Sequence, residues 1–151
     1  MFIGIDLVKA ARWERILTKF PRQAEKIFTP EEIAHCDSKG VHRAESYAAL
    51  WAVREAAGKA LGIGIFGSSW QDAYVTWARW GAPVLHLRGT FARRAEQLGV
   101  TEMAVSISHE DGMATAVVVM QGKTSGTAGL IFSAFENEMK EETGNDSHDS
   151  K

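Results

Sequence analysis

The chain of 151 residues contains few of the residues that build disulfides, thiolate metal clusters or membrane spans. Cys36 is the only cysteine, which excludes an internal disulfide and a cysteine-based metal cluster and favours a reducing compartment. No apolar run approaches the about 20 residues that a membrane-spanning helix needs. The apolar N-terminal segment has no basic stretch before it and is interrupted by Asp6, unlike an export signal. We therefore expect a cytoplasmic protein that does not contact membranes.

The chain also lacks a strong excess of charge of either sign. Seventeen Lys and Arg residues stand against nineteen Asp and Glu residues, so the formal net charge is -2, which disfavours nucleic acid as a partner. Residues 1–120 are nearly neutral, whereas residues 121–151 are acidic and rich in Gly, Ser and Thr. We expect one domain over 1–120 and a C-terminal tail over 121–151. The tail is either flexible or forms a short docked helix with one apolar face made of Phe132, Phe135 and Met139.

Hydrophobic periodicity predicts a domain of the α+β class. Some segments alternate apolar and polar residues, as strands do, and others repeat apolar residues at helical spacing. The predicted elements are a strand over 2–8, a helix over 10–20, a helix that begins at Thr29, a long helix over 45–61, strands over 73–80 and 84–88, a helix over 90–98, and strands over 103–108 and 113–120. We expect an antiparallel sheet packed against the long helix.

Two predicted helices begin with a residue that can cap the first turn. Thr29 precedes a proline and stands three residues before Glu32, which is the pattern of a capping box. Thr90 is predicted to be the N-cap of the helix that Gly99 ends.

Asp6 stands inside the apolar first strand, between Ile5 and Leu7. A carboxylate that is buried there needs a cationic partner or a metal ion. Alternatively, Asp6 lies at the end of the strand and caps the following helix. The sequence around Asp6 leaves both possibilities open.

Trp51, Glu55 and Lys59 are spaced four residues apart, so they share one face of the long helix. Glu55 and Lys59 could form an exposed ion pair. However, most of the surrounding residues are apolar or small, which indicates a buried helix. With Asp6, the two side chains could instead form a site for a phosphate and a hard divalent cation such as Mg²⁺.

The sequence from Gly62 to Gly67 matches the pattern G-x-G-x-x-G. That pattern binds dinucleotides when it follows a strand and opens a helix, whereas here it follows a helix. We reject a dinucleotide-binding fold. Gly62 and Gly64 still allow the backbone to approach a ligand closely.

His109 follows Ser108 at the mouth of the second predicted hairpin. It could bind a phosphate or transfer a proton, or it could be a solvated turn residue. The histidines do not have the spacing of metal ligands.

Basic residues recur in the first helical region at intervals of three or four, and we call Arg12, Arg15, Lys19 and Arg22 the basic stripe. Such a stripe is usually a solvated helix face. It also suits an acidic helix of a partner protein.

Four blocks of sequence occur together and in order, over nearly all of residues 1–120. They are GIDLV from Gly4, IFTPEE from Ile27, WAVREAAGKALGIG from Trp51 and VSISH from Val105. In this combination the chain resembles the holo-acyl-carrier-protein synthases, the small 4'-phosphopantetheinyl transferases.

The resemblance implies a Mg²⁺-dependent transfer of 4'-phosphopantetheine from coenzyme A to a serine of apo-acyl-carrier protein, with release of adenosine 3',5'-bisphosphate, in fatty acid biosynthesis. It implies that Asp6 and Glu55 hold Mg²⁺, and that Glu55 and Lys59 are catalytic. Residues implied to border coenzyme A are Lys59, Gly62, Gly64, Ser108 and His109. The resemblance further implies a homotrimer, with His109 acting on a neighbouring subunit's ligand, and docking of the acidic carrier on Arg12, Arg15 and Arg22.

The chain departs from the family pattern in the long helix. Leu50 stands where the family usually has an arginine that helps to bind the phosphates of coenzyme A, and Arg54 stands in place of a lysine. The loss of that arginine is the argument for an alternative function, a non-catalytic homologue that binds coenzyme A or a carrier protein. Retention of Asp6, Glu55 and Lys59 favours the enzyme.

Overall fold

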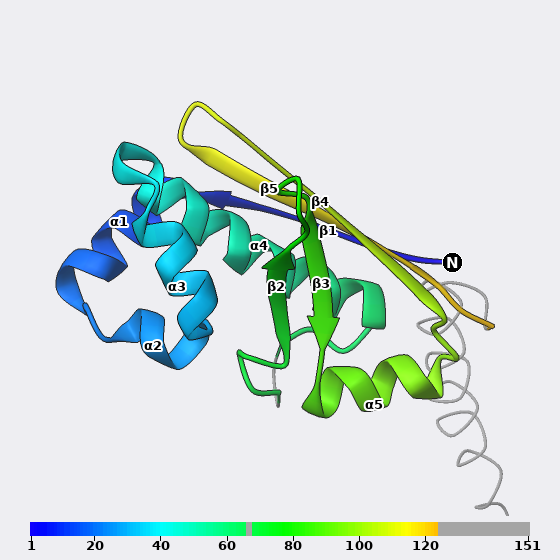
Figure 1. Ribbon diagram of the computed structural model, residues 1–151. Helices are drawn as coiled ribbons and strands as arrows, with labels where there is room; N and C mark the ends of the chain where they lie inside the picture. Colours follow the sequence, from blue (N-terminus) through cyan, green and yellow to red (C-terminus); the bar gives the residue numbers. More distant parts are fainter. Residues whose placement is uncertain (66–67, 124–151) are drawn as a thin grey trace, which may run out of the picture.

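A computed structural model describes residues 1–65 and 68–123 (Figure 1). The elements in chain order are β1 (Phe2–Lys9), α1 (Ala10–Lys19), α2 (Gln23–Ile27), α3 (Pro30–Asp37), a 3-10 turn (Gly40–His42), α4 (Arg43–Leu61), β2 (Ala73–Trp77), β3 (Pro83–Leu87), α5 (Gly89–Gln97), β4 (Glu102–Glu110) and β5 (Met113–Gln121). The predicted α+β class is confirmed, whereas α2 and the 3-10 turn are elements that the sequence did not predict. The proposed tail helix lies outside the described residues.

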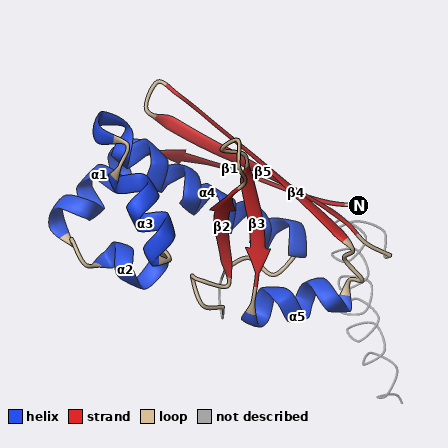
Figure 2. Ribbon diagram, viewed as in Figure 1, coloured by secondary structure: helices blue, strands red, loops and turns tan. Residues whose placement is uncertain are grey.

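Three antiparallel strands form the main sheet in the order β1-β5-β4, and β2 pairs with β3 in a separate hairpin (Figure 2). Alternation along β1 buries Phe2, Gly4 and Val8 against α4 and leaves Ile3, Ile5 and Leu7 exposed. The long helix therefore packs on one face of the sheet, as predicted. No helix in the described part of the chain is long and apolar enough to cross a bilayer.

Gly4 lets β1 approach α4 very closely. A Cβ atom at this position would lie 1.9 Å from the carbonyl oxygen of Ala56, which is far inside van der Waals contact. Small residues on α4 meet the strand from the other side, since Ala52, Ala56 and Ala60 are fully buried. This close approach brings the residue two positions after Gly4, Asp6, to the surface of α4.

The long helix begins two residues earlier than predicted, at Arg43, and ends as predicted at Gly62, which adopts the left-handed conformation with φ 71°. A neighbouring loop leaves no room for a side chain at Gly58, which lies inside the helix. A Cβ atom on Gly58 would lie 2.5 Å from the carbonyl oxygen of Gly64. The loop that follows α4 therefore folds back onto its last turn.

The capping box at Thr29 is confirmed. The backbone N–H of Glu32 donates to Oγ1 of Thr29 at 3.2 Å, and the backbone N–H of Thr29 donates to Oε2 of Glu32 at 2.9 Å. The predicted N-cap at Thr90 is wrong, because α5 begins at Gly89 and Arg88 occupies the N-cap position. The N–H of Thr90 instead donates to Oδ2 of Asp72 at 3.0 Å. A carboxylate distant in the sequence thus replaces a local cap.

Both predicted hairpins are present with altered ends. The first is shorter, because β2 ends at Trp77 rather than at Trp80. The second is longer, and it turns through Asp111 and Gly112, which both have positive φ angles of 49° and 73°.

Candidate active site

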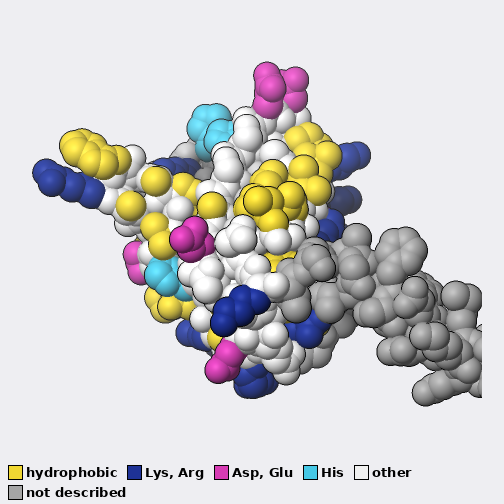
Figure 3. Space-filling view, turned by 90° about the vertical axis from the view of Figure 1, so that its right-hand side faces the viewer, with side chains coloured by type: hydrophobic (Ala, Val, Ile, Leu, Met, Phe, Trp, Pro, Cys, Tyr) yellow, Lys and Arg dark blue, Asp and Glu magenta, His cyan; other side chains and the backbone are white. Residues whose placement is uncertain are grey.

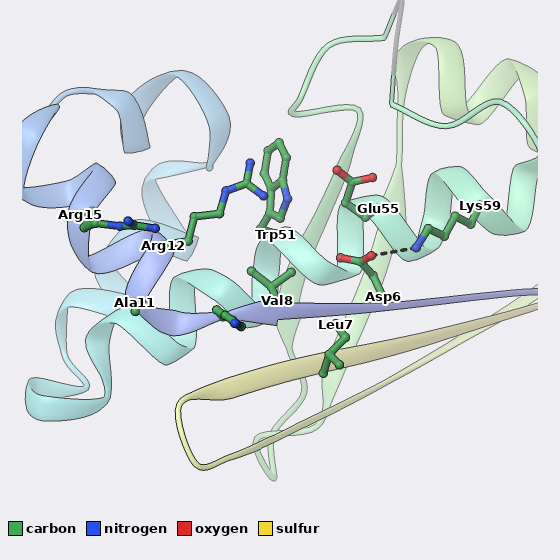
Figure 4. A pocket seen from close by; sticks show the side chains of 10 residues that line it. Asp6, Leu7, Val8, Ala11, Arg12, Arg15, Trp51, Glu55 and Lys59 are labelled. Atoms are coloured by element: carbon green, nitrogen blue, oxygen red, sulfur yellow. Dashed lines mark hydrogen bonds and ion pairs between the residues drawn. The ribbon is translucent and has the colours of Figure 1, made fainter.

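Asp6, Glu55 and Lys59 line one cavity of about 420 Å³, whose walls come from β1, α1 and α4 (Figure 4). The ammonium Nζ of Lys59 donates to Oδ1 of Asp6 at 2.8 Å and to the carbonyl oxygen of Ile5 at 2.9 Å. Asp6 lies within β1, which continues to Lys9, so it does not cap α1. Lys59 forms its ion pair with Asp6 rather than with Glu55. The structure thus excludes both local alternatives that the sequence left open.

The carboxylates of Asp6 and Glu55 both face this cavity. The pKa of Glu55 is raised, first because the side chain is partly buried and then because the Asp6 carboxylate lies nearby, while Lys59 and Arg12 oppose the rise. No group of three or more His, Cys, Asp and Glu side chains suited to a metal occurs among residues 1–65 and 68–123. Any cation held here would therefore take two protein carboxylates and complete its coordination with other oxygens.

Arg12 and Arg15 of the basic stripe line the same cavity. The guanidinium of Arg12 lies over the indole of Trp51, 6.0 Å from the ring centroid. The stripe does not continue along one helix, however. The first helix ends at Lys19, and Arg22 is the N-cap residue of α2, where it pairs with Glu25 at 3.8 Å between two exposed side chains.

An apolar groove of about 380 Å³ adjoins the cavity and shares Arg12 and Trp51 with it. The other lining residues come from α1, α2 and the segment before β2, and they are Trp13, Ile16, Phe20, Gln23, Ile27 and Trp70. The helical spacing of the apolar residues of α1 does not distinguish a buried face from a groove wall, so the sequence did not predict this groove. No motif or spacing in the sequence marked Trp70 as a candidate functional residue.

Ser108 and His109 lie away from this cavity within one chain. His109 lines another cavity, of about 360 Å³, together with Leu50 and Ser46. Its Nδ1 atom is 3.5 Å from Oε2 of Glu45. The two cavities use different faces of α4, since Trp51, Glu55 and Lys59 line the first and Ser46, Ala49 and Leu50 line the second.

Gly62 and Gly64 follow α4 and both have positive φ angles, of 71° and 59°. They stand outside the residues that line the cavity of Asp6, Glu55 and Lys59. Ser108 pairs with Thr115 in the sheet register, on the face that carries Leu7 rather than on the face packed against α4.

Comparisons with known proteins match this sequence and this fold. A model of the 4'-phosphopantetheinyl transferase superfamily matches residues 2–118. A holo-[acyl-carrier-protein] synthase from Kocuria rhizophila is 43% identical over 120 residues, which cover 80% of this chain and 91% of the relative. One from Moorella thermoacetica is 40% identical over 123 residues, covering 81% and 94%. The crystal structure of the Helicobacter pylori enzyme in complex with coenzyme A superposes with a TM-score of 0.69 at 33% identity, covering 79% of this chain and 99% of that one.

The fold, the four sequence blocks and the site therefore define a 4'-phosphopantetheinyl transferase. Within that superfamily the chain belongs to the holo-[acyl-carrier-protein] synthase family, and it is an enzyme. The family resemblance is confirmed, and the non-catalytic alternative is set aside.

Proposed function

We propose that this chain transfers 4'-phosphopantetheine from coenzyme A to a serine of apo-acyl-carrier protein, in a Mg²⁺-dependent reaction of fatty acid biosynthesis in the cytoplasm. The products are the holo-carrier and adenosine 3',5'-bisphosphate. The meeting of Asp6, Glu55 and Lys59 in one cavity, beside two arginines, is the observation that carries the proposal. The coenzyme A bound to the Helicobacter pylori relative supports it.

The carboxylates of Asp6 and Glu55 fit a Mg²⁺ ion. Their proximity contributes to the raised pKa of Glu55, and a divalent cation removes the repulsion between them. Mg²⁺ is usually held by one or two carboxylates together with substrate phosphates and water, which matches the two protein ligands available here. When bound, the ion would offset negative charge on the diphosphate of coenzyme A.

The Lys59 ammonium is placed to neutralise the same diphosphate. An ammonium has three N–H donors, and Lys59 uses two of them on Asp6 and Ile5. The third remains for a phosphate oxygen. In the reaction, the carrier serine oxygen attacks the phosphorus that bears pantetheine, the bond from that phosphorus to the adenosine bisphosphate breaks, and the serine proton is released to a base.

The exposed face of the main sheet supports assembly with further copies of this chain. Ile3, Ile5 and Leu7 are 57%, 59% and 63% exposed and lie side by side with Val117 and Val119 of β5. Figure 3 shows hydrophobic side chains gathered on this side of the molecule. Such patches mark interaction sites. We infer a homotrimer, as the family resemblance implies, with this face between subunits.

Assembly would also explain the placement of His109. Because α4 separates His109 from Glu55 and Lys59 in one chain, His109 can border a coenzyme A molecule at this site only if it comes from a neighbouring copy. We assign it, with Ser108, to that role. Gly62 and Gly64 would let the backbone after Lys59 approach the same ligand.

The basic residues Arg12, Arg15 and Arg22 are the proposed contacts of the acidic carrier protein. Arg12 and Arg15 stand at the rim of the cavity in which the serine must arrive, and Arg22 follows on α2. Charges of this kind act chiefly on the association rate and its salt dependence.

The decisive experiment measures the mass of a purified apo-acyl-carrier protein after incubation with this chain, coenzyme A and Mg²⁺. We expect a gain of one phosphopantetheine group, which EDTA abolishes and an excess of Mg²⁺ restores. An unmodified carrier would refute transfer, and a gain that persists in EDTA would refute the metal assignment.

A further inference from the structure

Arg54 is adjacent in sequence to Glu55, yet its guanidinium is buried on another side of α4. The residue is 2% exposed, and its guanidinium lies on the ring of Phe28 at 4.6 Å. It donates to both carboxylate oxygens of Glu32, at 2.6 and 3.1 Å, and to the carbonyl oxygen of Leu50 at 3.0 Å. Its remaining contact is different in kind, because Nε donates to the carbonyl oxygen of Trp70 at 2.9 Å.

The contacts with Glu32 explain why a cation is buried here. Glu32 is fully buried and also accepts the backbone N–H groups of Thr29 and Val75. The ion pair thus joins α3, α4 and β2, and both charges are satisfied. The bond to Trp70 is not required for this pairing of charges. It instead ties α4 to the segment that precedes β2.

Trp70 is the residue of that segment that reaches the apolar groove. It is 41% exposed, and its ring stands edge-on to Trp51, with centroids 6.4 Å apart and planes at 73°. Trp51 in turn supports Arg12 and belongs to both the groove and the catalytic cavity. The position of the Trp70 backbone therefore sets one wall of the groove beside the basic stripe.

We propose that Arg54 is a positioning residue for carrier-protein binding, which acts by holding Trp70 against Trp51 through the bond from Nε to the Trp70 carbonyl. The inference rests on the proposed function, in which the carrier docks beside Arg12. A planar guanidinium can bind Glu32 with one edge and Trp70 with Nε at the same time. A lysine ammonium at this position can keep the ion pair but does not have this forked geometry.

The test is the substitution Arg54→Lys, with steady-state kinetics in which coenzyme A and apo-carrier are varied separately. We expect the KM for the carrier to rise about three- to tenfold, which corresponds to the net value of one hydrogen bond. We expect kcat and the KM for coenzyme A to stay unchanged, because Arg54 is not among the residues that line the cavity. An equal loss for both substrates, or an unchanged KM for the carrier, would overturn the inference.

A double-substitution cycle separates positioning from general destabilisation. Trp70→Ala should raise the KM for the carrier, and Arg54→Lys combined with Trp70→Ala should be no worse than Trp70→Ala alone. Val75→Ala is the matched control, since it removes buried volume on β2 and should lower stability without changing the KM for the carrier. Additive effects, or a similar rise in the control, would show that Arg54 does not act through Trp70. Failure of the wild-type chain to modify the carrier would overturn the proposed function and this inference with it.

Discussion

The Nζ atom of Lys59 lies 2.8 Å from Oδ1 of Asp6, across an interface between α4 and β1. The two residues are separated by 53 positions in the sequence, so the contact depends on the packing of the helix against the strand. It holds an ammonium beside two carboxylates on rigid elements. A site that is arranged in this way spends little energy on reorganisation when charge develops in the reaction.

Removal of the Glu55 carboxylate tests the metal assignment. We expect Glu55→Ala to lower Mg²⁺-dependent transfer about 100-fold or more, a loss typical of removing one preorganised charged group from an active site. The measurement is the rate of carrier modification as a function of Mg²⁺ concentration. Glu96→Ala, which removes an exposed glutamate of α5, serves as the control and should retain full activity. Full Mg²⁺-dependent transfer by Glu55→Ala would show that this carboxylate serves only packing.

The close approach of β1 to α4 can be tested at Gly4. We expect Gly4→Ala to destabilise the fold by about 1–3 kcal/mol or more, because the new methyl group would meet the carbonyl oxygen of Ala56 and overpack the interface. Urea unfolding measures this loss, and the rate of transfer should fall in parallel as Asp6 moves from Lys59. Gly40→Ala is the comparison, because no atom lies within 4 Å of its added Cβ, although its positive φ adds backbone strain. An unchanged unfolding midpoint for Gly4→Ala would contradict the packing argument.

Charge reversal at the basic stripe tests the carrier contact. We expect Arg12→Glu with Arg15→Glu to weaken binding of the apo-carrier, mainly through a slower association rate, and to affect the carrier more than coenzyme A. Surface plasmon resonance at several salt concentrations measures the association rate and the affinity of the carrier. Binding of coenzyme A is measured separately. Arg22→Glu should have a smaller effect, because Arg22 already pairs with Glu25. Arg93→Glu on α5 is the control for overall charge. Unchanged carrier affinity at low salt would refute the contact.

The only cysteine provides a prediction about reactivity. Cys36 is fully buried, and burial together with Glu32 and Asp37 raises the pKa of its thiol to about 12. The thiolate is the reactive form, so the raised pKa keeps Cys36 protonated across neutral and mildly basic pH. We expect a thiol reagent to label it slowly in the native protein at pH 8 and rapidly, at one site per chain, in denaturant. Fast labelling of the native protein would show that this region opens readily.

The exposed sheet face provides a test of assembly. We expect Ile5→Glu to convert the proposed homotrimer to smaller species, since a carboxylate would be buried between copies without a partner. Native mass spectrometry measures the outcome, and Val41→Glu, at a nearly fully exposed site on the 3-10 turn, is the control. If the wild type is a monomer, the assignment of His109 to a neighbouring site is wrong.

Sequence alone determined the features that depend on local backbone geometry. Alternation along β1 placed Asp6 on the face of Gly4 and Val8, and the spacing of Trp51, Glu55 and Lys59 placed them on one helix face. The capping box at Thr29 was likewise predictable, because its two bonds join residues three positions apart. In each case the period of a strand or helix fixes the relationship before any tertiary contact forms.

Tertiary structure decided which of these residues meet. It chose Asp6 rather than Glu55 as the partner of Lys59, and it satisfied the N–H of Thr90 with Asp72 rather than with a local cap. It also placed Trp70 in the groove and His109 on the other side of α4. These contacts join segments that are far apart in the chain, and their geometry depends on how closely two elements pack, which no short-range spacing specifies.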